Sequence, residues 1–222
     1  MLFLICENIL TDSNSILRKE YKNRAIESYV SGSSSQRING SLQLTKPEYA
    51  YDQIDKTYDW CSNCGRSSSD HPWIILRIKN KSMKVAGYYI KIGCCGEDLG
   101  SRCCCYDGSN FCYHCCLYSW SFQISNDNTT WKTIHKVEKD KEMTRCKEKT
   151  FKFSETYSTN YVRLIQDEPC PGDKPCIALN KIEIIGSVEG SIDYISEDFN
   201  LENEDDDVSI IGHISKNNHK NN

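Results

Sequence analysis

The sequence contains no long apolar run. A membrane-spanning helix needs about 20 consecutive, mainly apolar residues, and no stretch of the 222 residues approaches that length. The opening segment MLFLICENIL has only a short apolar run before Glu7, without a preceding basic residue or a small-residue cleavage site, so it does not predict a signal peptide. These absences predict a protein without a transmembrane segment and slightly favour the cytoplasm. The location would be extracellular if the chain is a fragment of a secreted protein.

Concentrated positive charge is also absent. The chain has 27 Lys and Arg against 31 Asp and Glu, a net charge of -4. A nucleic acid backbone demands clustered cations, so we expect no nucleic acid partner. Nine acids and two lysines fall in residues 189–222. A segment so acidic cannot bury itself, which predicts a disordered C-terminal tail.

Residue sets typical of catalysis are scarce. Paired carboxylates lie mainly in the acidic tail, and neighbouring residues such as His114 and Cys115 do not have the geometry of a base and a nucleophile. We therefore predict no catalytic residues and no enzymatic activity.

Cysteine, in contrast, is abundant. Eight of the fourteen cysteines lie in GCCGEDLGSRCCCYDGSNFCYHCC, residues 93–116. One interpretation is a structural zinc site, because two Cys-x2-Cys pairs supply four thiolates: Cys61, Cys64, Cys112 and Cys115. A second is disulfides whose partners lie either across the cysteine-rich loop or in the loop of Cys61 and Cys64, with a Cys170–Cys176 bridge if the setting is oxidising. The third is a set of reduced, partly buried thiols.

Three Asn-x-Ser/Thr triplets bear on the same question of compartment. They begin at Asn39, Asn80 and Asn128. Such triplets accept N-linked glycans only outside the cytosol.

The pattern of apolar residues changes along the chain. Leu17, Tyr21 and Ala25 recur at four-residue spacing, which predicts a helix over residues 13–31. From about residue 41 the period becomes two, which predicts an all-β, antiparallel sandwich or barrel. The expected strands are residues 73–79, 85–93, 119–125, 131–137, 150–153, 161–166 and 178–186. Trp73, Trp120 and Trp131 are expected to anchor the core.

Residues 37–188 resemble a discoidin domain, also called a coagulation factor 5/8 type C domain, of the galactose-binding-like superfamily. The resemblance rests on Trp60 followed by WIILRI, then VAGYYI, WSFQISNDNTTW, YVRL and ALNKIEIIG, in the order of the family. It implies a jelly-roll β-sandwich. The expected organisation is a helical extension or linker (1–36), the module (37–188) and the tail (189–222).

The resemblance also implies a ligand site on loops at one end of the sandwich, here residues 60–72 and 93–118. It implies a binding module for a glycan, a lipid head group or a protein, with a role in adhesion. The loops offer these candidate ligand-binding residues: Trp60, Arg66, His71, Arg102, Tyr106, Phe111, Tyr113 and His114. The alternative is an intracellular protein-interaction or scaffold domain whose cysteine-rich loop is held by zinc.

Overall fold

A computed structural model describes residues 14–94, 105–108, 110–112 and 115–189. Its helical elements are α1 (Ile16–Lys22) and a 3-10 helix (Pro47–Ala50). Its strands, in chain order, are β1 (Ile26–Val30), β2 (Ser35–Ile38), β3 (Ser41–Leu44), β4 (Trp60–Cys61), β5 (Trp73–Ile78), β6 (Met83–Ile92), β7 (Cys105–Asp107), β8 (Asn110–Cys112), β9 (Ser119–Ser125), β10 (Lys132–Val137), β11 (Glu148–Thr159), β12 (Tyr161–Glu168) and β13 (Ala178–Val188).

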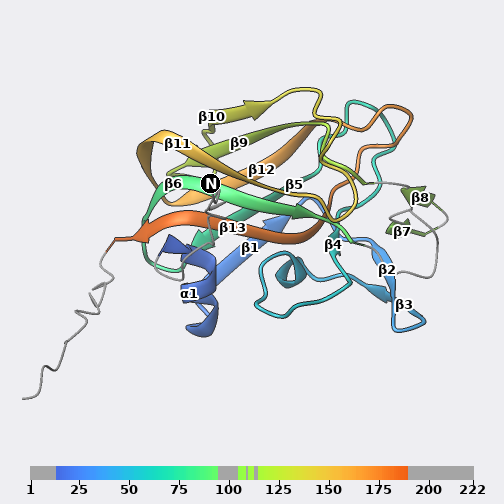
Figure 1. The fold of residues 1–222 in the computed structure, drawn as a ribbon, viewed down its shortest axis with the longest axis horizontal. Coiled ribbons are helices and arrows are strands. Elements are labelled where there is room, and N and C mark those ends of the chain that lie inside the picture. The colour runs from blue at the N-terminus through green and yellow to red at the C-terminus, as the bar shows by residue number, and fades with distance from the viewer. Residues whose placement is uncertain (1–13, 95–104, 109, 113–114, 190–222) are drawn as a thin grey trace, which may run out of the picture. The chain divides into compact units, whose positions relative to one another are not determined.

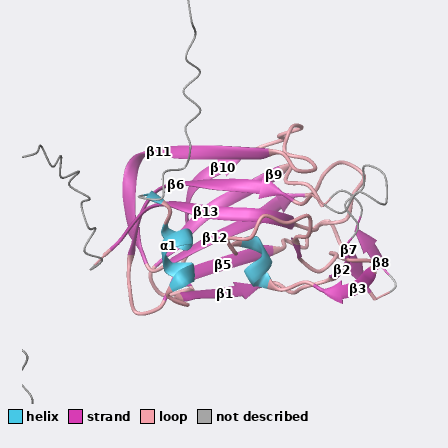
Figure 2. Cartoon of the chain, turned by 60° about the horizontal axis from the view of Figure 1, so that its bottom comes forward, coloured by secondary structure: helices cyan, strands magenta, loops and turns pink. Residues whose placement is uncertain are grey.

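The strands form three antiparallel sheets (Figures 1 and 2). A five-stranded sheet has the order β1-β5-β12-β9-β10, and a four-stranded sheet has the order β11-β6-β13-β4. These two sheets enclose the core. A small third sheet, β3-β2-β7-β8, lies beside the loops at one end of the sandwich. The predicted all-β, antiparallel sandwich with a short N-terminal helix is confirmed.

Side-chain alternation explains why the two larger sheets pack together. On β12, Val162, Leu164 and Gln166 are buried while their neighbours are partly exposed. Inside, the rings of Tyr88 and Phe122 stack with centroids 4.3 Å apart, and the indole of Trp120 donates a hydrogen bond of 3.0 Å to the Tyr88 hydroxyl. Large aromatic rings at these inward positions fill the space between sheets, which stabilises the sandwich.

Two of the three predicted tryptophan anchors are less buried than expected. Trp120 is fully buried, as predicted, but Trp73 and Trp131 are only partly buried. The guanidinium of Arg163 lies 4.1 Å from the centre of the Trp131 ring, so that tryptophan serves as a cation–π platform on the outer side of the sheet.

The N-terminal helix is shorter than predicted. It ends at Lys22, and Ile26–Val30 forms strand β1, which pairs with β5. Arg24 adopts a left-handed backbone conformation, with φ of 53°, which turns the chain out of the helix and into the strand. The division into residues 1–36, 37–188 and 189–222 stays a prediction, but residues 26–30 contribute a strand to the larger sheet.

The seven predicted strands correspond to β5, β6, β9, β10, β11, β12 and β13. Within the described residues, no helix is long and apolar enough to cross a membrane. The predicted tail lies outside the described residues, except for Glu189.

Candidate functional site

Disulfides join the two predicted loops. Cys61 is bonded to Cys105, and Cys64 is bonded to Cys112. The first bond ties β4 to β7, and the second ties the segment after β4 to β8. The segment after Trp60 and the described part of residues 93–118 therefore lie side by side at one end of the sandwich.

Two more disulfides lie at the same end. Cys94, after β6, is bonded to Cys146, just before β11. Cys116, before β9, is bonded to Cys170, after β12. Because neighbouring strands are antiparallel, the end of one and the start of the next meet at one edge, which brings these cysteines within bonding reach.

This pairing corrects two predictions. Cys170 is bonded to Cys116, so the expected Cys170–Cys176 bridge is not formed. Of the proposed zinc ligands, Cys61, Cys64 and Cys112 are in disulfides, and Cys115 alone is a free, buried thiol. A sulfur in a disulfide has no thiolate to offer a metal, so the four-cysteine zinc site does not fit this structure.

A pocket opens beside these bridges. Its volume is about 410 Å³, and its lining consists of Ser31, Asn63, Cys64, Gly65, Arg66, Ser69, Asp70, His71, Pro72 and Asp107. Most of this lining comes from the β4–β5 loop, while Ser31 follows β1 and Asp107 ends β7. The pocket therefore lies where the β4–β5 loop meets β7, which belongs to the second predicted loop, residues 93–118.

Asp70 organises the outer part of the loop. Its Oδ2 atom accepts hydrogen bonds from the backbone N–H groups of Arg66 (2.6 Å) and Ser67 (3.0 Å). These bonds favour the ionised form and hold the pKa of the Asp70 carboxyl below its ordinary value. Both go to Oδ2, so the other carboxylate oxygen, Oδ1, accepts no hydrogen bond from a described residue and is open to a ligand.

His71 is fixed through one ring nitrogen. Its Nδ1 lies 3.0 Å from the carbonyl oxygen of Gln166. A carbonyl can only accept, so Nδ1 carries the hydrogen and Nε2 is the free position. Gln166 is itself buried, and its amide donates to the carbonyls of Cys116 and Cys176, both at 2.9 Å. The imidazole is thereby anchored to the bridged part of the fold.

Two glycines allow the pocket wall to pack closely. Gly32 has φ of +147°, and a Cβ there would lie 2.2 Å from Nδ2 of Asn63. Gly65 donates a backbone hydrogen bond of 2.7 Å to Pro175, and a Cβ there would lie 2.9 Å from the proline ring. Larger side chains would push Asn63 and the loop away from their places.

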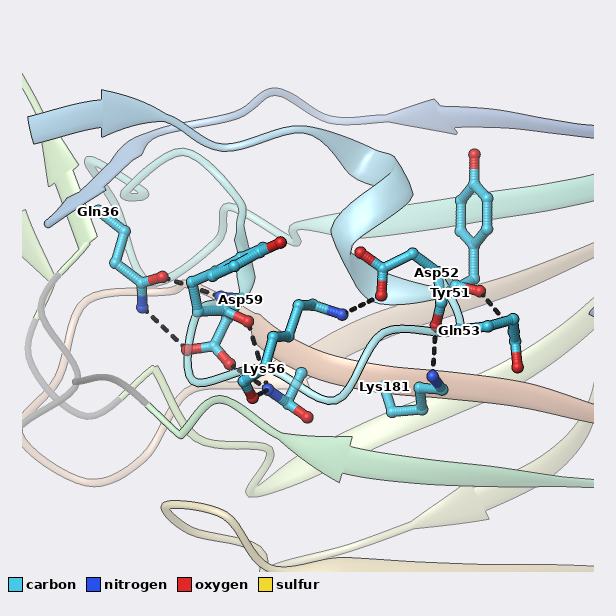
Figure 3. Close-up of polar contacts among 9 residues, drawn as sticks. Gln36, Tyr51, Asp52, Gln53, Lys56, Asp59 and Lys181 are labelled. Atoms are coloured by element: carbon cyan, nitrogen blue, oxygen red, sulfur yellow. Dashed lines mark hydrogen bonds and ion pairs between the residues drawn. The ribbon is translucent and has the colours of Figure 1, made fainter. Parts of the chain in front are cut away.

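A buried polar network supports the small sheet beside the pocket (Figure 3). Gln36 of β2 and Asp59 exchange two hydrogen bonds of 2.8 Å each: the Gln36 amide donates to the Asp59 carboxylate, and the Asp59 N–H donates to the Gln36 side-chain oxygen. The Asp59 carboxylate also accepts from the backbone of Cys94 at 2.9 Å and from the side chain of Asn180 at 3.1 Å. Satisfied networks of this kind fix the position of the elements they join.

Two lysines continue the network on the other side of the same loop. The ammonium groups of Lys56 and Lys181 contact the Asp52 side chain and the Asp52 carbonyl respectively (Figure 3). The Lys56 ammonium and the Asp52 carboxylate are nearly completely buried. Because Lys181 belongs to β13, its contact with Asp52 holds the loop 51–59 against that strand.

The predicted ligand-binding residues have different outcomes. Arg66 and His71 are exposed and line the pocket. Trp60 is fully buried on β4 and its indole donates to Ser33 at 3.1 Å, so its prediction as a ligand platform is wrong. Tyr106 is half-buried on β7, and Phe111 is described only by its backbone in β8. The remaining three lie outside the described residues: Arg102, Tyr113 and His114.

Sequence reasoning missed five polar residues of the pocket, namely Ser31, Asn63, Ser69, Asp70 and Asp107. For Asp70 a signal was present, since an aspartate that follows a serine run at a loop end is typical of a side chain that binds nearby backbone N–H groups. No sequence signal pointed to Asp107, because its position beside the pocket depends on the Cys61–Cys105 disulfide.

Comparison with known proteins gives a likeness of fold. No protein-family model matches the chain, and no curated protein matches it. Among solved structures, the chain is similar to CpGH89CBM32-5 from Clostridium perfringens, in complex with GalNAc-beta-1,3-galactose, with a TM-score of 0.50 and 12% identity over 72% of this chain and 94% of that one.

Two further structures are similar. The family 32 carbohydrate-binding module from C. perfringens NanJ, in complex with galactose, has a TM-score of 0.49 and 11% identity over 78% of this chain and 98% of that one. Chitosan-binding module 1 of a chitosanase/glucanase from Paenibacillus sp. IK-5 has a TM-score of 0.47 and 16% identity over 72% and 94%. The likeness to CpGH89CBM32-5 supports the predicted fold, a jelly-roll β-sandwich.

Proposed function

We propose that the protein is a non-catalytic carbohydrate-binding module and that the sugar binds in the pocket of the β4–β5 loop. The observation that carries the proposal is the set of polar residues that line one pocket: Asn63, Arg66, Asp70, His71 and Asp107. The fold shared with carbohydrate-binding modules supports it, and a volume of about 410 Å³ lies within the range of small-molecule sites.

The free atoms match the chemistry of sugar hydroxyls. A hydroxyl both donates and accepts a hydrogen bond. Oδ1 of Asp70 and Nε2 of His71 can accept, and the exposed guanidinium of Arg66 can donate. Because hydrogen bonds to charged groups are stronger than neutral ones, Arg66 and Asp70 are expected to provide the main contacts.

The charges favour a neutral sugar. The lining carries one guanidinium and the two carboxylates of Asp70 and Asp107. An acidic sugar or a phosphate head group would meet these carboxylates and be repelled. This balance disfavours the lipid head group, and the described lining also has no large apolar side chain to enter a membrane surface.

The disulfides support an extracellular or otherwise oxidising location for this module, in place of the cytoplasm. Such bonds persist in oxidising compartments and are rare in the cytosol, and four are present among the described cysteines. The intracellular scaffold held by zinc loses its support, since three of its four ligands are bonded to other cysteines.

The test is titration of the oxidised protein with galactose, N-acetylgalactosamine and a wider glycan panel, followed by the same titration of Arg66→Ala and His71→Ala. Each substitution is expected to weaken binding about tenfold or more, the loss typical of one hydrogen bond to a charged or well-placed group. Lys84→Ala is the control, because Lys84 is an exposed cation on β6 near the opposite end of the strands.

Binding that neither Arg66→Ala nor His71→Ala weakens would refute the pocket as the site. Absence of binding to every sugar, with the disulfides formed, would refute the function. Protein captured instead by anionic lipid vesicles would favour the lipid alternative.

A further inference from the structure

Two cysteines of the described chain remain unbonded, and they face each other. Cys115 and Cys176 are both about 1% exposed. Their sulfur atoms lie 2.6 Å apart. This separation is far shorter than the contact of two unbonded sulfur atoms and only slightly longer than the bond of about 2.05 Å in a disulfide.

The pair belongs to a buried cluster rich in cysteine. Cys61, Cys64, Cys105, Cys112 and Ala178 complete the buried cluster. Burial raises the pKa of the Cys115 thiol well above its ordinary value. The backbone holds the two segments together, because the N–H of Ala178 donates to the carbonyl of Cys115 at 3.2 Å.

We propose that Cys115 and Cys176 form a fifth disulfide. The two thiols lose two protons and two electrons, one S–S bond forms, and a low-molecular-weight disulfide or a disulfide oxidase of the oxidising compartment is reduced to two thiols. With Cys61–Cys105 and Cys64–Cys112, the new bond makes a buried hub of three bridges.

The hub would act on the pocket through the segment that contains Cys176. Pro175 accepts the backbone hydrogen bond from Gly65 in the pocket wall. The carbonyl of Cys176 accepts from Gln166, whose own carbonyl holds His71. A bond between Cys115 and Cys176 therefore fixes both the loop wall and the imidazole.

Mapping of the disulfides tests the proposal. Unreduced, denatured protein is alkylated and cut with a protease that cleaves before aspartate, which separates Cys170 from Cys176 at Asp173. The peptide of residues 107–126 contains Cys112, Cys115 and Cys116. It is expected to be linked to both fragments and, through Cys112, to the peptide that contains Cys64. Cys115→Ser should release only the Cys176 fragment, and the control Cys116→Ser should release only the Cys170 fragment.

Three results would overturn the fifth bridge. They are alkylation of Cys176 in the unreduced wild type, a link from Cys176 to a cysteine other than Cys115, or a Cys105–Cys115 link. The Cys105–Cys115 link is the most direct alternative, because the sulfur atoms of these two cysteines lie 3.3 Å apart. Loss of a native disulfide is expected to lower the melting temperature of Cys115→Ser by roughly 5 to 15 °C.

A separate observation concerns the three Asn-x-Ser/Thr triplets. Asn39 lies between β2 and β3, Asn80 between β5 and β6, and Asn128 between β9 and β10, all exposed. All three have left-handed backbone conformations, with φ of 50°, 56° and 60°. Among the described residues, their side-chain amides have no hydrogen-bond partner.

We propose that these three asparagines are sites of N-linked glycosylation. The amide nitrogen attacks the first sugar carbon of a lipid diphosphate-linked oligosaccharide. An N–C bond forms, the bond from that carbon to the diphosphate oxygen breaks, and one amide proton leaves. An exposed asparagine at a turn presents its amide to such an enzyme, whereas a residue inside a strand would not.

Two of the glycans would lie far from the pocket. In the five-stranded sheet, Tyr161 pairs with both Arg77 and Ser125, so the turns that follow β5 and β9 lie at the same end. The pocket residue Pro72 precedes β5, and Asn80 follows it. At about 3.3 Å per residue of strand, roughly 25 Å separate them. Glycans on Asn80 and Asn128 would therefore leave the pocket open.

The test is secretion of the full chain from a eukaryotic cell, with digestion by an amidase that removes N-glycans and converts each modified asparagine to aspartate in heavy-oxygen water. Three substitutions are each expected to lower the mass of the intact glycoprotein by the mass of one glycan: Asn39→Gln, Asn80→Gln and Asn128→Gln. Asn126→Gln, in the same turn as Asn128 but outside a triplet, should remove none. An unlabelled asparagine at any of the three positions, in protein with its disulfides formed, refutes that site.

Discussion

Glu183 is a buried carboxyl group that should make the fold less stable as pH rises. It lies on β13, is 4% exposed, and accepts hydrogen bonds from the backbone N–H groups of Leu17 (2.7 Å), Arg18 (3.1 Å) and Ile184 (2.8 Å). Burial raises its pKa from the ordinary 4.5 to about 7, although the hydrogen bonds oppose that rise. The folded protein therefore holds the proton more tightly than the unfolded chain.

The sign of the effect follows from proton linkage. Below the unfolded pKa of 4.5 both states are protonated, and the stability that comes from the raised pKa is fully present. Between 4.5 and about 7 the unfolded carboxyl is ionised while the folded one is not, so the free energy of unfolding falls as pH rises. Above about 7 the loss is complete. At about 1.4 kcal/mol per factor of ten in acidity, the full loss is roughly 3 kcal/mol.

Glu183→Gln should remove this dependence, because an amide does not ionise in the range and its oxygen can still accept from Leu17. Urea unfolding of the disulfide-intact protein at about pH 5 and about pH 8 is expected to show that the wild type loses about 2 kcal/mol more than the variant. Burial lowers the pKa of His135, which has the opposite sign, but this contribution is common to both proteins and cancels.

Glu48→Gln is the control, since Glu48 is an exposed carboxylate in the 3-10 helix. It should behave as the wild type does. Equal losses of stability in wild type and Glu183→Gln between the two pH values would show that the reasoning on Glu183 is wrong.

Three substitutions test other parts of the fold. Trp60→Ala empties a fully buried site and should cost about 3 to 5 kcal/mol in urea unfolding; a cost below about 1 kcal/mol would contradict its place in the core. Gly186→Ala would put a Cβ 1.9 Å from the Lys84 carbonyl oxygen. It should lower the melting temperature far more than Gly172→Ala, where a Cβ meets nothing within 4 Å. Equal decreases in melting temperature would argue against the clash. Asp127→Ala removes the acceptor of two backbone N–H groups in the β9–β10 turn, so amide hydrogen exchange in that turn should accelerate. Unchanged exchange would show that the Asp127 carboxylate does not stabilise the turn.

The main strands were predictable because burial on one face imposes a period of two. Val162, Leu164 and Gln166 on β12 show this directly. β1 was missed for a physical reason. Leu17, Tyr21 and Ala25 all pack at the core with helical four-residue spacing, so the pattern predicts a helix that continues beyond Ala25. The helix ends earlier, because Arg24 adopts a left-handed conformation.

The site was predicted less completely. Arg66 and His71 were proposed because they lie in a loop at one end of the expected fold. Both line the pocket, and their role in binding stays a prediction. Trp60 was misplaced because a large aromatic beside a cysteine gives no local sign that β4 pairs with β13 and buries it. The cysteine pairs join residues 44 to 54 positions apart, and no local pattern encodes such contacts.

The four disulfides between described cysteines all lie at one end of the sandwich, while the stacked rings of Tyr88 and Phe122 pack in its interior without a covalent bond between the sheets. A reducing agent is therefore expected to loosen the loops around the pocket before it unfolds the sandwich. The same separation would let the sequences of the loops change while the sandwich beneath them stays intact.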